Sequence, residues 1–243
     1  MSAPQTRRGA AQALPQGDEK RKAVQAMFDT IAPRYDLVNR VMTFRMDVGW
    51  RRRTVRDLGL APGSLVVDLA SGTGDLCHDL TRASLRPVAV DLSFGMLDHA
   101  THRFPRVQGD GLTLPFATGS VDGVVCGFAL RNFVALPPVL AELARIIRPG
   151  GRIALLDVSV PANPLLRMGH GIYFGRVVPL IGGLLSDGAA YRYLPKSVAY
   201  LPPPAEMLRM IHDAGFTAVE RSQLSTGISQ LICATRDHDR QAP

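Results

Sequence analysis

Cysteine is scarce in this chain: its 243 residues include three, Cys77, Cys126 and Cys233, and no two of them form a CxxC pair. Cysteines this far apart supply no disulfide framework. A free cysteine usually packs as a small apolar side chain. We therefore predict three free, buried thiols, a reducing cytoplasm as the compartment, and no metal site.

Long apolar runs are also absent. Spanning a bilayer takes about 18 or more consecutive apolar residues, and the nearest candidate, residues 165–185, is interrupted by Arg167, His170 and Arg176. Residues 1–22 contain no apolar segment of the kind that directs secretion. We predict a cytoplasmic protein without a transmembrane helix. A peripheral contact with the inner face of the cell membrane is a second hypothesis.

Lysine contributes only 3 of the 28 basic residues. The formal net charge of +7 could indicate a nucleic acid or an anionic membrane as a partner. An arginine-rich chain with much Ala, Gly and Pro is, however, more typical of genomic codon usage than of a selected phosphate-binding face, so we predict no nucleic-acid partner. One dense cluster, residues 50–53 with Arg56, is either a solvated helix face or a contact to lipid headgroups, substrate or cofactor.

From Ser64 onward, short β-branched or apolar runs alternate with segments of helix length. This alternation is typical of βαβ units, which form a parallel sheet with helices on both faces. Two closing strand-like runs joined by a short turn predict a hairpin, so the last strand should be antiparallel. We predict a disordered tail (1–21) followed by one domain (22–236). The parts of this domain are N-terminal helices (22–62), a cofactor-binding core (64–158), a substrate-side insertion after the fifth strand (160–200), and a C-terminal helix with a hairpin (204–236).

The first predicted strand ends at Asp68 and leads through a glycine-rich turn into a helix that begins near Asp75. Gly72 and Gly74 permit a tight turn and the close approach of a ligand, at the carboxyl end of a strand, where α/β sheets bind cofactors. The dinucleotide pattern requires a third glycine three residues after Gly74, and Cys77 stands there. A nicotinamide-dependent oxidoreductase is therefore the weaker hypothesis.

The next two predicted strands also end in acids. Asp91 ends the second, where a carboxylate can accept hydrogen bonds from both hydroxyls of a ribose, or can cap the next helix. Asp110 and Gly111 end the third, where a carboxylate and a backbone amide could read an adenine edge. With the glycine turn and the terminal hairpin, these acids resemble the class I methyltransferase fold, a Rossmann-like, seven-stranded, mostly parallel sheet with an antiparallel last strand. The resemblance implies S-adenosylmethionine as the methyl donor.

Several stretches outside these motifs are similar to the UbiE/MenG family, the C-methyltransferases of menaquinone and ubiquinone biosynthesis. The similarity covers about residues 22–232. Many methyltransferases share the cofactor loop, but few share the first and third of the stretches that carry the similarity, which are MFDTIAPRYDLVNRVMT (27–43), FALRN (128–132), AYRYLPKS (190–197) and MLRMIHDAGF (207–216).

This resemblance implies that Thr73, Asp91, Asp110 and Gly111 bind S-adenosylmethionine, with Gly127 near a further contact. It also implies a polyprenylated quinol as substrate, most simply demethylmenaquinol, methylated on a ring carbon. A benzoquinol of the ubiquinone pathway, or another small or lipid acceptor, is the alternative. Three departures from the family pattern border the presumed substrate cavity and bear on that choice, namely Asp47, Ala129 and the pair Asp157-Val158.

A quinol carbon becomes nucleophilic only when the neighbouring hydroxyl loses its proton, so the site must favour a phenolate. The sequence leaves the base open. The candidates are Tyr35, Asp36, Asp157, and Tyr191 or Tyr193, while Arg131 could stabilise the developing oxyanion. Each could equally be a structural residue, and we expect His170 to be structural. The apolar side chains of 165–185 could line a groove for the isoprenoid tail or pack as a plain lid helix.

Overall fold

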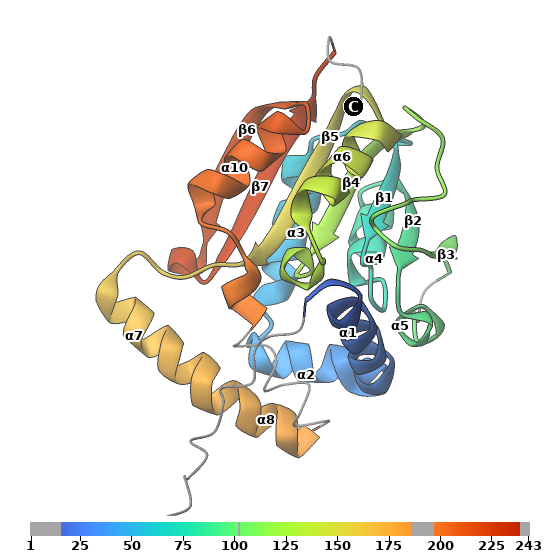
Figure 1. Cartoon of the computed structure of the whole chain (residues 1–243). Helices are drawn as coiled ribbons and strands as arrows, with labels where there is room; N and C mark the ends of the chain where they lie inside the picture. The colour runs from blue at the N-terminus through green and yellow to red at the C-terminus, as the bar shows by residue number, and fades with distance from the viewer. Residues whose placement is uncertain (1–15, 102, 186–196, 239–243) are drawn as a thin grey trace, which may run out of the picture.

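A computed structural model describes residues 16–101, 103–185 and 197–238 (Figure 1). Seven strands form one sheet in the order β3-β2-β1-β4-β5-β7-β6. The predicted seven-stranded α/β fold is thereby confirmed. The strands span β1 Leu65–Leu69, β2 Arg86–Asp91, β3 Arg106–Gln108, β4 Val121–Gly127, β5 Ile147–Val158, β6 Phe216–Leu224 and β7 Ser229–Arg236.

The direction of the strands matches the sequence pattern. Strands β1 to β5 run parallel, whereas β7 pairs antiparallel with both β5 and β6. The predicted antiparallel last strand is confirmed. The carboxyl ends of β1, β2 and β4 therefore reach the same edge of the sheet, next to α1 and α2 in Figure 1.

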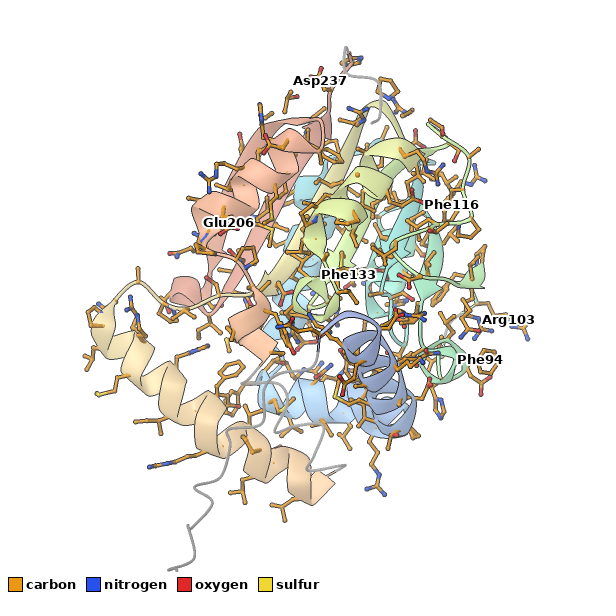
Figure 2. All side chains as sticks on the ribbon, viewed as in Figure 1. Phe94, Arg103, Phe116, Phe133, Glu206 and Asp237 are labelled. Carbon is orange, nitrogen blue, oxygen red and sulfur yellow. The ribbon has the colours of Figure 1, made fainter. Side chains whose placement is uncertain are left out.

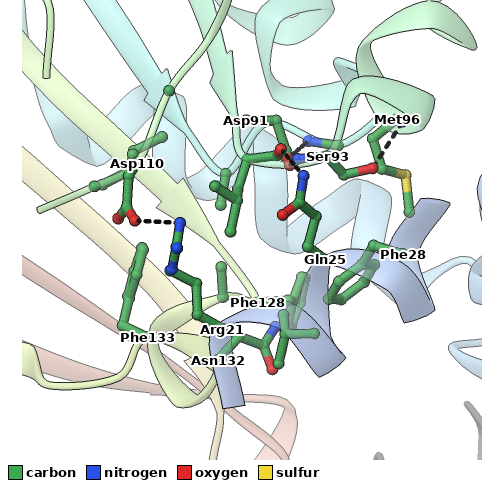
Figure 3. Close-up of a pocket in the computed structure, with 18 of the residues that line it drawn as sticks. Arg21, Gln25, Phe28, Asp91, Ser93, Met96, Asp110, Phe128, Asn132 and Phe133 are labelled. Atoms are coloured by element: carbon green, nitrogen blue, oxygen red, sulfur yellow. Dashed lines mark hydrogen bonds and ion pairs between the residues drawn. The ribbon is translucent and has the colours of Figure 1, made fainter. Parts of the chain in front are cut away.

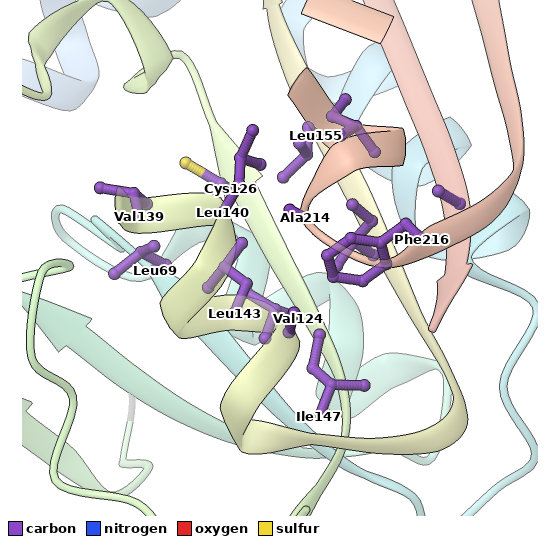
Figure 4. Close-up of a cluster of buried hydrophobic side chains, with 14 of the residues drawn as sticks. Leu69, Val124, Cys126, Val139, Leu140, Leu143, Ile147, Leu155, Ala214 and Phe216 are labelled. Atoms are coloured by element: carbon purple, nitrogen blue, oxygen red, sulfur yellow. The ribbon is translucent and has the colours of Figure 1, made fainter. Parts of the chain in front are cut away.

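Helices cover both faces of the sheet because neighbouring strand residues point to opposite sides. Val66 packs with the apolar residues of α3 (Met46–Leu58) and α4 (Asp75–Arg82). Val67, the next residue, packs with those of α6 (Leu136–Ile146) and α10 (Pro204–Asp213). Figure 4 shows this second cluster, which contains Leu140 and Leu143 of α6, Val124 of β4 and Phe216 of β6.

The N-terminal helices lie across the carboxyl edge of the sheet. They are α1 (Gly17–Ile31) and α2 (Tyr35–Met42), and α1 packs beside the short helix α5 (Phe94–Asp98). Because α1 begins at Gly17, part of the segment that we predicted to be a disordered tail is helical; residues 1–15 lie outside the described part of the chain.

The predicted insertion after β5 forms α7 (Pro164–Ile172) and α8 (Val178–Leu185). A five-residue π-helix, Tyr173–Val177, joins them. In Figure 1 this pair is an elongated arm below the sheet, and α8 contacts α2. None of the helices described in the structure is both long and apolar enough to cross a membrane.

Candidate active site

The glycine-rich turn after β1 adopts the conformation that its glycines permit. Gly72 and Gly74 have φ values of 57° and 89°, angles that glycine adopts more readily than any other residue. A Cβ on Gly74 would lie 2.1 Å from Cζ of Phe104. The turn therefore packs closely on one side, while its other side, at Gly72, faces a cavity.

Asp91, at the end of β2, holds this turn in place. Its Oδ2 accepts a hydrogen bond from the amide of Gly72 and its Oδ1 accepts one from the amide of Ser93, both over 2.8 Å. Burial raises the pKa of this carboxyl above its ordinary value, and the two amide bonds oppose the shift. Figure 3 shows Asp91 on the wall of the cavity, where each carboxylate oxygen retains lone pairs for a ligand.

The cavity beside these residues contains about 820 Å³ of empty space, counted out to open solvent. Five of the eight predicted cofactor-binding residues line it: Gly72, Asp91, Asp110, Gly111 and Gly127. The structure thus brings the ends of β1, β2 and β4 together around one cavity with the turn after β3.

The other three predicted cofactor-binding residues do not line the cavity. Asp68 is completely buried, and its Oδ2 accepts a hydrogen bond from the thiol of Cys77 over 3.3 Å. Burial raises the pKa of Asp68 to about 7. Gly74 packs on Phe104, as described above. Thr73 is buried, and its hydroxyl donates to Asp36 over 2.5 Å. These residues support the turn on the side that faces away from the cavity.

Helix α1 forms a wall of the cavity that the sequence motifs gave no reason to expect. Arg21, Gln25 and Phe28 all face the cavity, as does Val24. Gln25 donates from Nε2 to the carbonyl of Leu92 over 3.2 Å, and Arg21 lies 3.7 Å from the carboxylate of Asp110 (Figure 3). The amphipathic spacing of residues 24–31 is the one sequence signal for a buried face here.

Lys20 anchors the start of α1. Its Nζ donates to the carbonyl of Phe133 over 2.6 Å and lies 3.6 Å from the centre of the Tyr200 ring. Burial lowers the pKa of Lys20 to about 8. Contacts to two distant parts of the chain thereby hold the start of α1 next to the cofactor cavity, which Phe133 lines.

A second, larger cavity, with about 1670 Å³ of empty space counted out to open solvent, lies between the N-terminal helices and the arm formed by α7 and α8. Three aromatic residues, Phe28, Tyr35 and Phe128, line both this cavity and the cofactor cavity. The two cavities therefore meet at a ring of aromatic side chains. The rest of the second cavity is mostly apolar, and its apolar lining includes Met27, Ile31, Met42, Phe44, Trp50, Leu165, Leu166, Phe174, Val178 and Ile228.

Tyr35 is the only predicted catalytic candidate on both cavities among the described residues. Burial raises the pKa of its hydroxyl, and a hydrogen bond with Asn39 together with the charge of Arg131 partly offsets that shift. The phenol stays protonated at neutral pH, so it can donate a hydrogen bond but is a poor base.

Arg131 and Asp157 form a buried ion pair. Arg131 Nη1 lies 2.5 Å from Oδ1 of Asp157, and its Nε donates to the hydroxyl of Ser197 over 3.1 Å. Arg131 lines the second cavity, whereas Asp157 does not. Asp157 thus fixes the orientation of the guanidinium of Arg131. Arg131 is placed to bind an anionic group in the second cavity.

The remaining candidates are placed differently. Asp36 lines neither cavity and accepts the hydrogen bond of Thr73. Tyr191 and Tyr193 lie outside the described residues. His170, which we expected to be structural, lines the second cavity. Of the three departures from the family pattern, Asp47 and Val158 border the second cavity and Ala129 borders the first.

The sheet order, the glycine turn and the acids on the first cavity define a class I methyltransferase, the class that takes its methyl group from S-adenosylmethionine. A solved S-adenosylmethionine-dependent methyltransferase from Thermotoga maritima has the same fold, with a TM-score of 0.63 and 17% identity over 88% of this chain and 99% of that one. The chain belongs to the ubiE/COQ5 methyltransferase family, whose sequence model matches residues 16–236. The resemblance seen in the sequence is thus confirmed.

Two curated relatives illustrate the family. The chain is 41% identical to a "Ubiquinone/menaquinone biosynthesis C-methyltransferase UbiE" from Syntrophotalea carbinolica, over 86% of this chain and 92% of that protein. It is 38% identical to a "Demethylmenaquinone methyltransferase" from Corynebacterium kroppenstedtii, over 90% of this chain and 96% of that protein.

Proposed function

We propose that this enzyme transfers the methyl group of S-adenosylmethionine to a ring carbon of a polyprenyl quinol, with demethylmenaquinol as the main acceptor. The observation that carries the proposal is the large apolar cavity that meets the cofactor cavity at Phe28, Tyr35 and Phe128. The names of the family relatives support the same acceptor. A ubiquinone-pathway benzoquinol remains the second candidate, because the Syntrophotalea relative is named for both pathways.

The residues of the first cavity suit S-adenosylmethionine. Asp91, Asp110 and Gly111 all line this cavity. In our proposal the carboxylate of Asp91 accepts from two ribose hydroxyls, and Asp110 with the backbone at Gly111 binds the adenine. At Gly72 a Cβ would lie 3.7 Å from Cε1 of Tyr35, so the missing side chain leaves room between the turn and that ring. When bound there, the cofactor supplies an activated methyl group.

The aromatic residues at the junction of the two cavities would bind the sulfonium group of the methyl donor. Faces of aromatic rings attract cations, by about 0.5–2 kcal/mol per contact, and the methyl donor is a sulfonium cation. The rings of Phe28 and Tyr35 lie 5.9 Å apart, edge to face, beside Phe128. Such a junction excludes water and aligns the methyl group with the acceptor carbon. Arg131, with five N–H donors and a fixed orientation, would stabilise the phenolate.

A polyprenyl acceptor also implies access from a bilayer, and the arm is suited to it. Leu165, Met168, Leu180 and Leu184 are 71%, 60%, 64% and 76% exposed along α7 and α8, and Phe44 beside them is 71% exposed. Such an apolar helical face with interspersed arginines is typical of helices that lie in the membrane interface. We propose that this face rests on an anionic bilayer.

Methylation can be tested directly. Purified protein, S-adenosylmethionine and a reduced demethylmenaquinone with a short prenyl chain should yield a product that carries one more methyl group by mass spectrometry. The benzoquinol analogue and the naphthoquinol without its tail would be run in parallel. Turnover of the tail-less quinol alone, or of none of the three, would refute the polyprenyl-quinol proposal.

Membrane contact has its own test. The double variant L180Q/L184Q should lose flotation with vesicles that contain anionic lipid. F94Q is the matched control, because Phe94 is also exposed, at 62%, but lies on α5, at the right of Figure 2 and away from the arm. Equal flotation of all three proteins, or none by the wild type, would refute this contact.

A further inference from the structure

His170 lies on the last turn of α7, where the arm borders the second cavity. Its Nε2 is shielded from solvent and has no hydrogen-bond partner among the described residues. Its ring lies 4.4 Å, centre to centre, from that of Phe174 at a tilt of 31°. A buried imidazole nitrogen without a partner usually calls for an explanation, because such a group loses its hydrogen bond to water.

An aromatic cluster extends from His170 to the junction of the two cavities. Phe174 belongs to the same apolar cluster as Phe28 and Tyr35, two of the three residues at the junction of the cavities. The histidine is therefore stacked on the cluster that reaches the junction of the two cavities. It also sits next to the π-helix Tyr173–Val177, an element that often occurs at functional sites.

No charge of the described residues acts appreciably on His170. Burial lowers the pKa of its imidazole below the ordinary value, and no neighbouring charge contributes to the shift. The imidazole is consequently neutral at pH 7. The titratable or charged side chains that share its cavity or its helix are Tyr35, Asp47, Arg51, Arg131, Arg167 and Tyr173.

We propose that His170 is the general base of this methyl transfer, and that its Nε2 takes the proton from the quinol hydroxyl next to the carbon that is methylated. This inference rests on the proposed quinol substrate. The other candidates are less suited, because Tyr35 holds its proton, Asp157 is bound to Arg131, and Asp36 lines neither cavity.

The protons and electrons of the step balance. His170 Nε2 removes the hydroxyl proton, and the electron pair of the O–H bond moves into the ring. The ring carbon then forms its bond to the methyl group, and the electron pair of the broken C–S bond stays on sulfur. The methylated carbon loses its own hydrogen as a proton to water, while the imidazolium returns its proton to the ring oxygen. One proton is released overall.

The test compares H170Q and H170A with the wild type and with the control H212Q, since His212 is exposed at the end of α10. Loss of a general base typically costs a factor of about 100 or more in kcat. Both His170 variants should show that loss, with KM and the affinity for S-adenosylhomocysteine changed less than about twofold. Added imidazole should restore part of the rate of H170A.

The pH profile distinguishes a base from a packing residue. The base must be neutral, so kcat of the wild type should be constant at high pH and fall as pH drops through the pKa of His170. That acid limb should disappear in H170Q. A His170 variant with wild-type kcat, or one whose loss is confined to KM with an unchanged limb, overturns the assignment. No product from the wild type refutes the proposed function as well, whereas product from the wild type leaves that function standing.

Discussion

The hydroxyl of Thr73 donates to the carboxylate of Asp36 over 2.5 Å, and this bond joins the glycine turn to the first turn of α2. The residue before Asp36 is Tyr35, which lies where the two cavities meet. We therefore expect a change at Thr73 to affect both cavities, although Thr73 itself lines neither.

T73V should expose that connection. Valine preserves the shape of the side chain but leaves the partly buried Asp36 without its donor, and a hydrogen bond to a charged group contributes about 1.5–3 kcal/mol. We expect a free energy of unfolding lower by about that amount and weaker S-adenosylhomocysteine binding by calorimetry. T81V is the control, because the Thr81 hydroxyl donates to the carbonyl of Cys77 in its own helix. Equal effects of the two changes would contradict the connection.

D91N should weaken cofactor binding without unfolding the protein. The amide keeps one acceptor oxygen but loses the charge that two backbone amides share and that, in the proposed site, two ribose hydroxyls would share. The expected loss is about 1.5–3 kcal/mol, which is about a 10- to 100-fold rise in the Kd for S-adenosylhomocysteine. D98N, an exposed acid on the neighbouring helix α5, should leave the Kd unchanged. An unchanged Kd in D91N would remove Asp91 from the site.

Asp68 should make stability depend on pH. Its pKa in the folded protein is about 7, well above that of the unfolded chain, so the native state binds more protons between about pH 4 and 7. Stability from this group is therefore present at low pH and is lost as pH rises through that window. D68N should have a higher Tm than the wild type at pH 8 and nearly the same Tm at pH 5. A lower Tm at pH 8 would contradict this.

Two variants can separate the contribution of the Arg131–Asp157 ion pair to stability from its contribution to methyl transfer. R131M leaves a completely buried carboxylate unpaired, which typically costs about 3–5 kcal/mol. The double variant R131M/D157L removes both charges and should recover much of that stability in urea unfolding. We expect it to remain impaired in methyl transfer, because the phenolate loses its cation. Wild-type kcat in the double variant would show that Arg131 is structural only.

Local motifs predicted the part of the site that depends on strand ends. Asp91 and Gly72 could be anticipated because each follows a strand whose direction in a parallel sheet is fixed by the chain pattern. Asp68 shows the limit of that reasoning. It too stands near the end of a strand, but strand residues alternate between the faces, and its side chain points into the protein toward Cys77.

Contacts between distant segments could not be predicted in the same way. Gln25 reaches the backbone of Leu92, 67 residues away, and Lys20 reaches Phe133, 113 residues away. Such contacts depend on how α1 docks on the finished sheet, and no spacing within α1 encodes the partner. The cofactor cavity therefore has a wall that becomes visible only in three dimensions.

The elements that line the two cavities affect the order in which the methyl donor and the acceptor bind. Helix α1 lines the first cavity and part of the second, whereas α7 and the π-helix line only the second. We therefore expect the arm to affect the entry of the acceptor more than the exchange of the nucleoside. We expect S-adenosylhomocysteine to be replaced by a fresh methyl donor without movement of the arm, so that neither ligand has to bind first. Initial-rate kinetics should accordingly follow a random sequential scheme.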